Sequence, residues 1–114
     1  MSKHLHAERH GEFLVVQFLD KVIDTDLATG SLGEELYKIL DRPDCSNLVL
    51  NFSGVEFLGS AMLSKLLSAN KMMGQKGGVL RLCEMNPNIR LVFQYTRLDQ
   101  ILDTRGAEAD ALEL

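Results

Sequence analysis

The apolar residues of this chain repeat with two different periods, and the central segment shows both. Residues 48–52 are nearly all apolar, a run too short for a helix and typical of a strand that is buried on both faces. After Ser60 the apolar residues recur three and four positions apart, which is the spacing of a helix with one buried side. These positions are Met62, Leu63, Leu66, Leu67 and Met73. Glycines at 74, 77 and 78 end this helix, and residues 79–83 form the next strand.

The pattern predicts a hairpin at the amino terminus. Gly11 and Glu12 form its turn, and residues 13–19 form its second strand, in which only Gln17 interrupts the apolar run. Both faces of that strand are therefore expected to be covered. A helix then begins at one of the capping residues 24–26 and ends near Leu40. A capping box that starts at Ser31 offers a later beginning for the same helix.

Beyond residue 83 the pattern predicts a helix, a short strand and a final segment. Pro87 suits the first turn of the helix. The apolar side of this helix is assigned to Ile89, Leu91, Val92 and Tyr95, with Phe93 at its margin. Residues 101–104 are expected to form a short edge strand, and residues 108–114 a final amphipathic helix or a frayed end. The resulting order, ββαβαβαβα, predicts an α/β fold with a mixed, largely parallel β-sheet.

Length and charge narrow the class of protein. A chain of 114 residues holds one core rather than two, so we treat residues 1–114 as a single domain. A net charge of −4 and a pI near 5.3 argue against nucleic acid or an anionic membrane as the main partner, because both bind clustered Lys and Arg. The sequence shows neither a membrane span nor the layout of a signal peptide, which predicts a cytoplasmic protein.

The cysteines and histidines do not suggest a metal or a disulfide. Cys45 and Cys83 lie far apart without a CxxC pattern, which predicts buried, reduced thiols. No Cys, Asp or Glu completes a metal site with His4, His6 and His10, so we interpret the three histidines as solvated side chains and expect no metal.

The motifs of common enzyme classes are absent. The chain has no GxxxxGK[ST], GxGxxG or HExxH, so we expect no nucleotide cofactor and no metalloprotease activity. The segment around Ser60 lacks the second glycine of a serine hydrolase elbow, and no histidine follows His10 to act as a base. Glu56, Glu84 and Asp103 follow predicted strands, but solvated loop charges explain them more simply than an active site. We therefore predict that the chain is not an enzyme.

Ser60 lies where the central loop meets the central helix. Serine is a preferred N-cap residue, so its hydroxyl is expected to accept from the amide of Met62 or Leu63, a contact worth about 1 kcal/mol. The same hydroxyl, if it is exposed, would be a phosphoryl acceptor at the positive end of a helix dipole. The pattern of residues leaves both interpretations open.

The succession of these segments resembles the STAS domain, in particular the bacterial anti-sigma factor antagonists. The resemblance extends from about Phe13 to Leu102 and implies the STAS fold. The segments whose order and spacing resemble the family are the hairpin, Val22-Ile23-Asp24 before a helix, residues 48–52, residues 55–60, Lys76-Gly77-Gly78 and residues 90–93.

This resemblance implies a small regulatory protein with a switch. Members of the family bind an anti-sigma factor that is itself a serine kinase, and phosphorylation of a serine at the start of the central helix turns them off. Ser60 occupies that position. The partner-binding surface is expected to comprise Leu58, Gly59, Ser60, Ala61 and Ser64. Gly59, Ala61 and Met62 stand where the family usually has Asp, then Ser or Thr, then Gly.

Two alternative functions stay open at this point. One is a non-enzymatic STAS scaffold subunit of a transport or stress-signalling complex, either as a homo-oligomer or within a larger assembly. An exposed Met62 or Met72 would give such a subunit a permanent apolar interface. The other is a ligand sensor, because some members of the family bind nucleotides or lipids, although this sequence carries no recognisable phosphate-binding motif.

Overall fold

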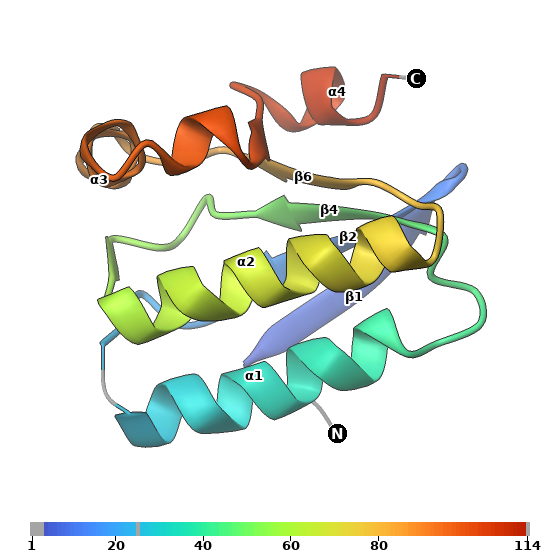
Figure 1. The fold of residues 1–114 in the computed structure, drawn as a ribbon, viewed down its shortest axis with the longest axis horizontal. Coiled ribbons are helices and arrows are strands. Elements are labelled where there is room, and N and C mark those ends of the chain that lie inside the picture. The colour runs from blue at the N-terminus through green and yellow to red at the C-terminus, as the bar shows by residue number, and fades with distance from the viewer. Residues whose placement is uncertain (1–3, 25, 114) are drawn as a thin grey trace.

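A five-stranded sheet forms the centre of the protein in the computed structural model, which describes residues 4–24 and 26–113 (Figure 1). The strands lie in the order β1-β2-β4-β6-β7. Strands β1 and β2 form an antiparallel hairpin, and every other neighbouring pair in this sheet is parallel. The bounds are Leu5–His10 for β1, Phe13–Phe18 for β2, Asn47–Asn51 for β4, Leu80–Cys83 for β6 and Asp103–Thr104 for β7.

Helices cover both faces of the sheet. Helices α1 and α2 lie side by side against one face (Figure 1), and the short α4 contributes Ala111 to the core on the other face. None of the described helices has the length and apolar content needed to cross a membrane. The helical bounds are Asp26–Leu40 for α1, Ser60–Gln75 for α2, Pro87–Tyr95 for α3, Leu98–Gln100 for the 3-10 helix η1 and Glu108–Ala111 for α4.

The alternation of side chains along the strands explains why the sheet has two apolar faces. Leu14 and Val16 of β2 point toward α1 and α2 and belong to the main core, whereas Phe13 and Val15 belong to the smaller core near α4. Strand β2 is thus buried on both faces and only Gln17 is exposed, as its sequence predicts.

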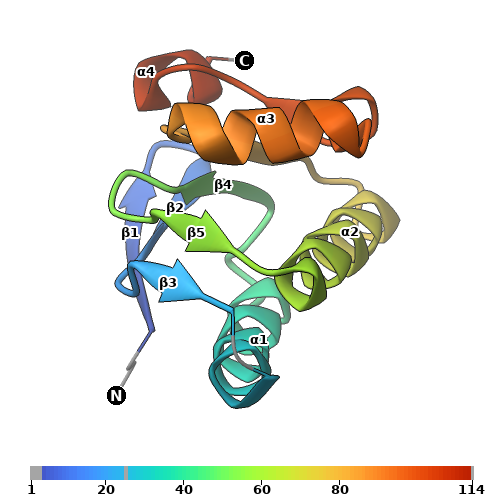
Figure 2. The same ribbon diagram turned by 90° about the vertical axis from the view of Figure 1, so that its left-hand side faces the viewer.

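A second, two-stranded sheet was not predicted from the sequence. Val22–Ile23 (β3) and Phe57–Leu58 (β5) pair in parallel, within segments that the apolar pattern assigns to loops. Figure 2 shows these strands below α3 and beside the start of α2. Apart from these two strands and η1, the order of elements is the predicted ββαβαβαβα.

Several local predictions need correction. Helix α1 begins at Asp26, so the later start at Ser31 is wrong, and the candidate cap Thr25 lies outside the described residues. In α3 the buried side chains are Ile89 and Phe93, whereas Leu91 and Tyr95 are 46% and 84% exposed. Residues 89 and 93 are four positions apart and share the face toward the core, which places 91 and 95 away from it.

His4 is also not the solvated side chain that its position suggests. Its Nδ1 lies 2.5 Å from an Asp20 oxygen and its Nε2 lies 3.9 Å from a Glu35 oxygen. The two carboxylates therefore contact opposite nitrogens of the ring and do not converge on one point. Across residues 4–24 and 26–113, no group of three or more His, Cys, Asp or Glu side chains is arranged to hold a metal ion.

Both cysteines are free and buried, as the sequence predicts. Burial raises the pKa of Cys45. Burial, followed by the negative charges of Glu108 and Glu84, raises the pKa of Cys83 to about 12. The reactive thiolate is thus suppressed at both positions.

Lys76 ties the end of α2 to the end of α1. Its ammonium group donates to the carbonyl oxygens of Leu40 and Cys45, both at 2.6 Å, and to that of Arg42 at 3.3 Å. The last carbonyl groups of a helix lack donors within the helix and favour a nearby cation. The chain then turns at Gly77, which has a φ of 79°.

We predict that Lys76→Met lowers the free energy of unfolding by about 1 to 2 kcal/mol, because carbonyl groups at the end of α1 lose a charged donor. Lys71→Met is the matched control, since Lys71 is exposed on α2 and its side chain makes no hydrogen bond or ion pair with the described residues. Urea denaturation of the two variants measures the difference. Equal losses would show that the contacts of Lys76 do not stabilise the fold.

We also predict that neither thiol is alkylated by iodoacetamide in the native protein at pH 8. The pKa of Cys83 is far above this pH and both sulfur atoms are buried, so almost no thiolate is available. Intact mass after alkylation, with and without urea, measures the reaction. Modification of the folded protein at the rate seen in urea would contradict the buried placement.

Candidate functional site

The start of α2 is held in place by the backbone of Gly59. The Gly59 N–H donates to the carbonyl oxygen of Ile23 at 2.8 Å, which attaches the end of β5 to the end of β3. Gly59 is extended, with φ −84° and ψ 167°. Its carbonyl oxygen accepts from the N–H groups of Met62 at 3.1 Å and Leu63 at 3.4 Å. Gly59 is therefore the N-cap residue of the helix.

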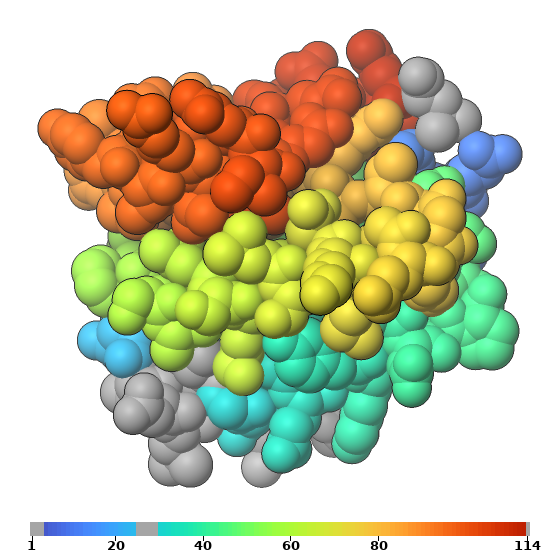
Figure 3. Space-filling model, viewed as in Figure 1, coloured from blue at the N-terminus to red at the C-terminus, as the bar shows by residue number. Residues whose placement is uncertain are grey.

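Ser60 is the first residue inside α2, so the prediction that its hydroxyl caps the helix is wrong. The amides of Met62 and Leu63, which were the expected donors to that hydroxyl, are bonded to Gly59 instead. Ser60 is exposed, and within the described residues its hydroxyl makes no hydrogen bond. The space-filling view shows the first turn of α2 at the surface, below α3 (Figure 3).

The amino-terminal end of α2 carries an unbalanced positive potential. The N–H groups of Ser60 and Ala61 have no acceptor in the part of the chain that the structure describes, and the first turn contains no acidic side chain. The first N–H groups of a helix and its dipole together attract negative charge. The exposed Ser60 hydroxyl thus lies beside a helix end that favours an anion.

The structure brings most of the predicted partner-binding residues to the surface. Ser60, Ala61 and Ser64 are exposed, and Gly59 is partly exposed. The side chain of Leu58 is only 6% exposed and packs in the main core. This segment therefore presents small side chains around the start of α2, which lets another molecule approach the backbone closely.

The structure explains two of the residues that differ from the usual STAS pattern, Gly59 and Met62. A Cβ atom at Gly59 would lie 3.2 Å from the Asp24 Cα and 3.4 Å from the Ile23 oxygen, so the end of β3 leaves little room for a side chain. Met62 is fully buried in the main core. The predicted possibility of an exposed Met62 is therefore wrong, and Met72 is also partly buried against the core.

The surface beside Ser60 includes features that sequence reasoning missed. Val22 and Phe57, which are paired in the β3–β5 sheet, are 47% and 50% exposed. Next to Phe57, a cavity of about 250 Å³ opens between β5 and α3. Its lining residues are Glu56, Phe57, Leu58, Asn88, Ile89, Val92 and Phe93. Strands of two residues show no repeating pattern of apolar positions, so this surface could not be predicted from the sequence.

The acidic residues considered as enzymatic candidates have different surroundings. The Glu84 carboxylate accepts from the Glu108 N–H at 2.7 Å. Asp103 forms ion pairs with Arg105 and Arg81, and the hydrogen bond from Arg105 is the main reason that the pKa of Asp103 is lowered. Glu56 lines the cavity beside β5 and shares another cavity with Glu84, whereas Asp103 lines neither. The structure thus does not bring the three carboxylates together.

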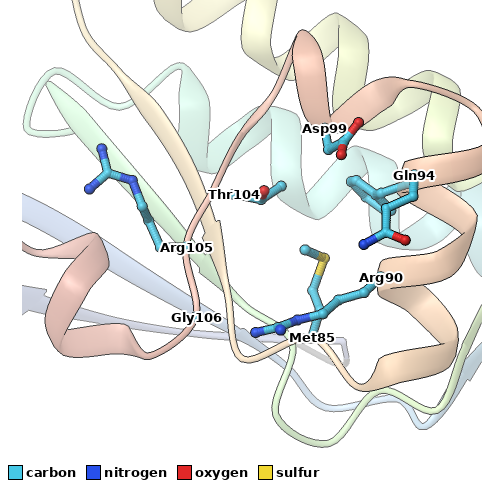
Figure 4. Close-up of a pocket in the computed structure, with 8 residues that line it drawn as sticks. Met85, Arg90, Gln94, Asp99, Thr104, Arg105 and Gly106 are labelled. Atoms are coloured by element: carbon cyan, nitrogen blue, oxygen red, sulfur yellow. The ribbon is translucent and has the colours of Figure 1, made fainter.

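A second cavity, of about 320 Å³, lies on the opposite flank of α3 (Figure 4). Arg90 and Gln94 of α3 line it together with Asp99 of η1 and Thr104 of β7. Arg105 also borders this cavity, but its guanidinium group points away and pairs with Asp103. None of the residues predicted for partner binding lines this cavity, so the candidate site is the surface around Ser60.

Comparisons with known proteins agree with this architecture. The family model described as the STAS domain matches residues 5–111. An anti-sigma F factor antagonist from Paenibacillus polymyxa is 25% identical over 113 residues, covering 98% of this chain and 94% of that protein. An anti-sigma factor antagonist from Mycobacterium paratuberculosis is 26% identical, with a TM-score of 0.80 over 95% of this chain and 89% of that chain. A STAS domain protein from Planctomyces limnophilus has a TM-score of 0.83 at 18% identity, with 95% and 94% of the two chains covered.

We predict that Gly59→Ala lowers the free energy of unfolding by about 1 to 2 kcal/mol, because the added carbon is crowded by the end of β3. Gly54→Ala is the control, since nothing lies within 4 Å of its added carbon. The control should be neutral or stabilising by up to about 1 kcal/mol. Urea denaturation measures both changes.

Gly59→Ser separates crowding from the loss of a good N-cap residue, because serine adds the same carbon with an oxygen that is able to cap. If Gly59→Ala and Gly59→Ser lower the free energy of unfolding by similar amounts, crowding is the cause. Full stability of Gly59→Ser would contradict the close packing against β3.

Proposed function

The chain belongs to the STAS domain family, and from this premise we propose that it is an anti-sigma factor antagonist that binds an anti-sigma factor through the surface around Ser60. The family model covers nearly the whole described chain, and similar proteins from Paenibacillus polymyxa and Mycobacterium paratuberculosis carry the name of this activity. We propose further that the anti-sigma factor is a serine kinase and that it phosphorylates Ser60. The protein would thus act in the cytoplasm as a regulator and not as an enzyme.

The observation that carries this proposal is the exposed hydroxyl of Ser60 at the first position of α2, which makes no hydrogen bond to any residue that the structure describes. A serine that capped the helix would already use its oxygen, and its modification would disturb the fold. Here Gly59 begins the helix with its backbone. The hydroxyl is therefore available to a kinase without any loss of a structural contact.

A phosphoryl group on Ser60 would be tolerated by the free protein. It would add about 1.5 to 2 negative charges beside the N–H groups of Ser60 and Ala61, which have no other acceptor in the described structure. A helix amino terminus with free N–H groups is a favourable environment for phosphate. Phosphorylation is thus expected to leave the fold intact.

The effect of the phosphoryl group would fall on the complex. A partner that packs closely over Gly59, Ser60 and Ala61 would have to enclose the added charge and remove its water. Burying a charge without a compensating partner is costly, and a mismatched charge at an interface costs several kcal/mol. Phosphorylation would therefore release the anti-sigma factor.

The alternative of a scaffold subunit receives no support from the residues that suggested it. Met62 is fully buried and Met72 packs against the core, so neither residue provides the exposed apolar surface that a permanent interface would need. The exposed residues of the first turns of α2, Ser60, Ala61 and Ser64, are small, so neither methionine adds an apolar patch there.

We predict that Ser60→Asp weakens binding to the cognate anti-sigma factor by at least about tenfold, while Ser60→Ala binds like the wild type. An aspartate adds a charge where the partner must pack closely, whereas alanine removes only an unbonded oxygen. Calorimetric titration against the purified anti-sigma factors of the same organism measures the affinities. Intact mass after incubation with ATP and each factor should show one phosphoryl group on the wild type and none on Ser60→Ala.

Ser68→Asp serves as the control, because Ser68 is exposed on the same helix about two turns from Ser60. It should bind as the wild type does. Equal affinities of Ser60→Asp and the wild type would contradict the switch, and the absence of any binding anti-sigma factor would contradict the proposed function itself.

A further inference from the structure

Two apolar side chains protrude together from the small β3–β5 sheet. Val22 and Phe57 are partners in the register of the two strands and are about half exposed. The next residues, Ile23 and Leu58, are buried in the main core. Because side chains alternate along a strand, Val22 and Phe57 share the outer face. Single exposed apolar residues are ordinary, but these two form a continuous pair.

The pair adjoins a cavity with mostly apolar walls. Phe57 and Leu58 form one side, and Ile89, Val92 and Phe93 of α3 form the other. The volume of about 250 Å³ is below the roughly 300 Å³ at which small-molecule sites usually begin. A single inserted side chain from another protein therefore fits this cavity better than a free metabolite does.

The rim of this surface carries negative charge. Glu56 lines the cavity and Asp24 directly follows β3. Both residues are exposed, and neither carboxylate forms an ion pair with the described residues. Lys21, which precedes β3, offsets one of these charges and is also without an ion pair there. The surface thus favours an apolar group that is accompanied by Lys or Arg.

This surface is continuous with the proposed site at Ser60. Phe57, Leu58, Gly59 and Ser60 follow one another, and the hydrogen bond from the Gly59 N–H to the Ile23 oxygen joins the sheet to the start of α2. Figure 2 shows β3, β5 and the start of α2 on one side of the molecule, with α3 above them. A partner that packs over Ser60 consequently meets Phe57 as well.

We infer that the anti-sigma factor inserts an apolar side chain, flanked by a basic residue, into an apolar docking surface formed by Val22, Phe57 and the cavity between β5 and α3. This inference rests on the proposed function and extends it. The apolar docking surface supplies most of the affinity, and Ser60 supplies the discrimination between the unmodified and phosphorylated states. Buried aromatic contacts near the centre of an interface commonly dominate its binding free energy.

The test uses Phe57→Ser and Val92→Phe against the purified anti-sigma factor that binds the wild type. The first variant removes the protruding ring, and the second fills the cavity without removing apolar surface. Calorimetry should show binding about 30-fold weaker for Phe57→Ser and about tenfold weaker for Val92→Phe. Leu91→Ser is the matched control, because Leu91 is 46% exposed on α3 next to Val92 but does not line the cavity. It should stay within about twofold of the wild type.

The charge of the rim has its own test in the same assay. Glu56→Gln is expected to slow association and to reduce its dependence on salt, because it removes an attraction to a basic group. Glu12→Gln, at the hairpin turn, is the control and should change neither the association rate nor its dependence on salt. Equal association rates for Glu56→Gln and the wild type would overturn the basic component of the partner.

Hydrogen exchange provides a readout that does not depend on any variant. Amides of residues 22–23 and 57–58 in the wild type should exchange more slowly in the complex than in the free protein. Unchanged exchange there would overturn the inference, even if Phe57→Ser proves too unstable to assay. A loss of affinity for Leu91→Ser as large as that for Phe57→Ser would overturn it too.

The inference and the proposed function fail in different ways. If Ser60→Asp weakens binding while Phe57→Ser and Val92→Phe bind like the wild type, the proposed function stands and the apolar docking surface is overturned. If no anti-sigma factor binds the wild type, both are overturned.

Discussion

The hydrogen bond from the Gly59 N–H to the Ile23 oxygen fixes the part of the molecule on which its function depends. It joins two segments that are far apart in the sequence and brings the end of β3 so close that only a glycine fits at position 59 without crowding. Because Gly59 also begins α2 with its carbonyl oxygen, the Ser60 hydroxyl is not needed as the cap. The hydrogen bonds of the Gly59 backbone thus fix where the helix starts and place Ser60 as its first residue.

Much of the fold follows from the sequence, because its main elements are long or strongly patterned. In the run at 48–52 the apolar residues are buried, and in the stripe from Met62 to Met73 Met62, Leu66 and Met73 are fully buried, and burial of apolar area is the main favourable term in folding. The face of α3 was misjudged because Leu91 is as apolar as Ile89, and Tyr95 carries an aromatic ring as Phe93 does. Packing against the rest of the protein decides which pair is covered. Tertiary packing, which a single sequence does not contain, makes that choice.

The candidate site was located by sequence but not correctly described by it. A serine before a helical pattern indicates the start of a helix, and a difference of one position decides whether its oxygen is a cap or is free. That difference arises here because the Gly59 carbonyl accepts from the amides of Met62 and Leu63, while its N–H is bonded to Ile23. Gly59 and Ile23 are separated in the sequence by the whole of α1 and β4. Strands β3 and β5 escaped prediction because two residues cannot show an alternation. Val22 and Phe57 therefore looked like loop residues rather than one surface.

The packing on both sides of Ser60 suggests why a switch at this position would act on the partner and not on the fold. Gly59 is held against β3, and Met62, the third residue of the helix, is fully buried in the core. The backbone that carries Ser60 is consequently anchored before and after it. A charge added to an anchored side chain cannot be removed from an interface by a small movement of the helix, so the partner must either solvate it or dissociate. A rigid start of α2 thus makes the chemical state of one oxygen decisive for binding.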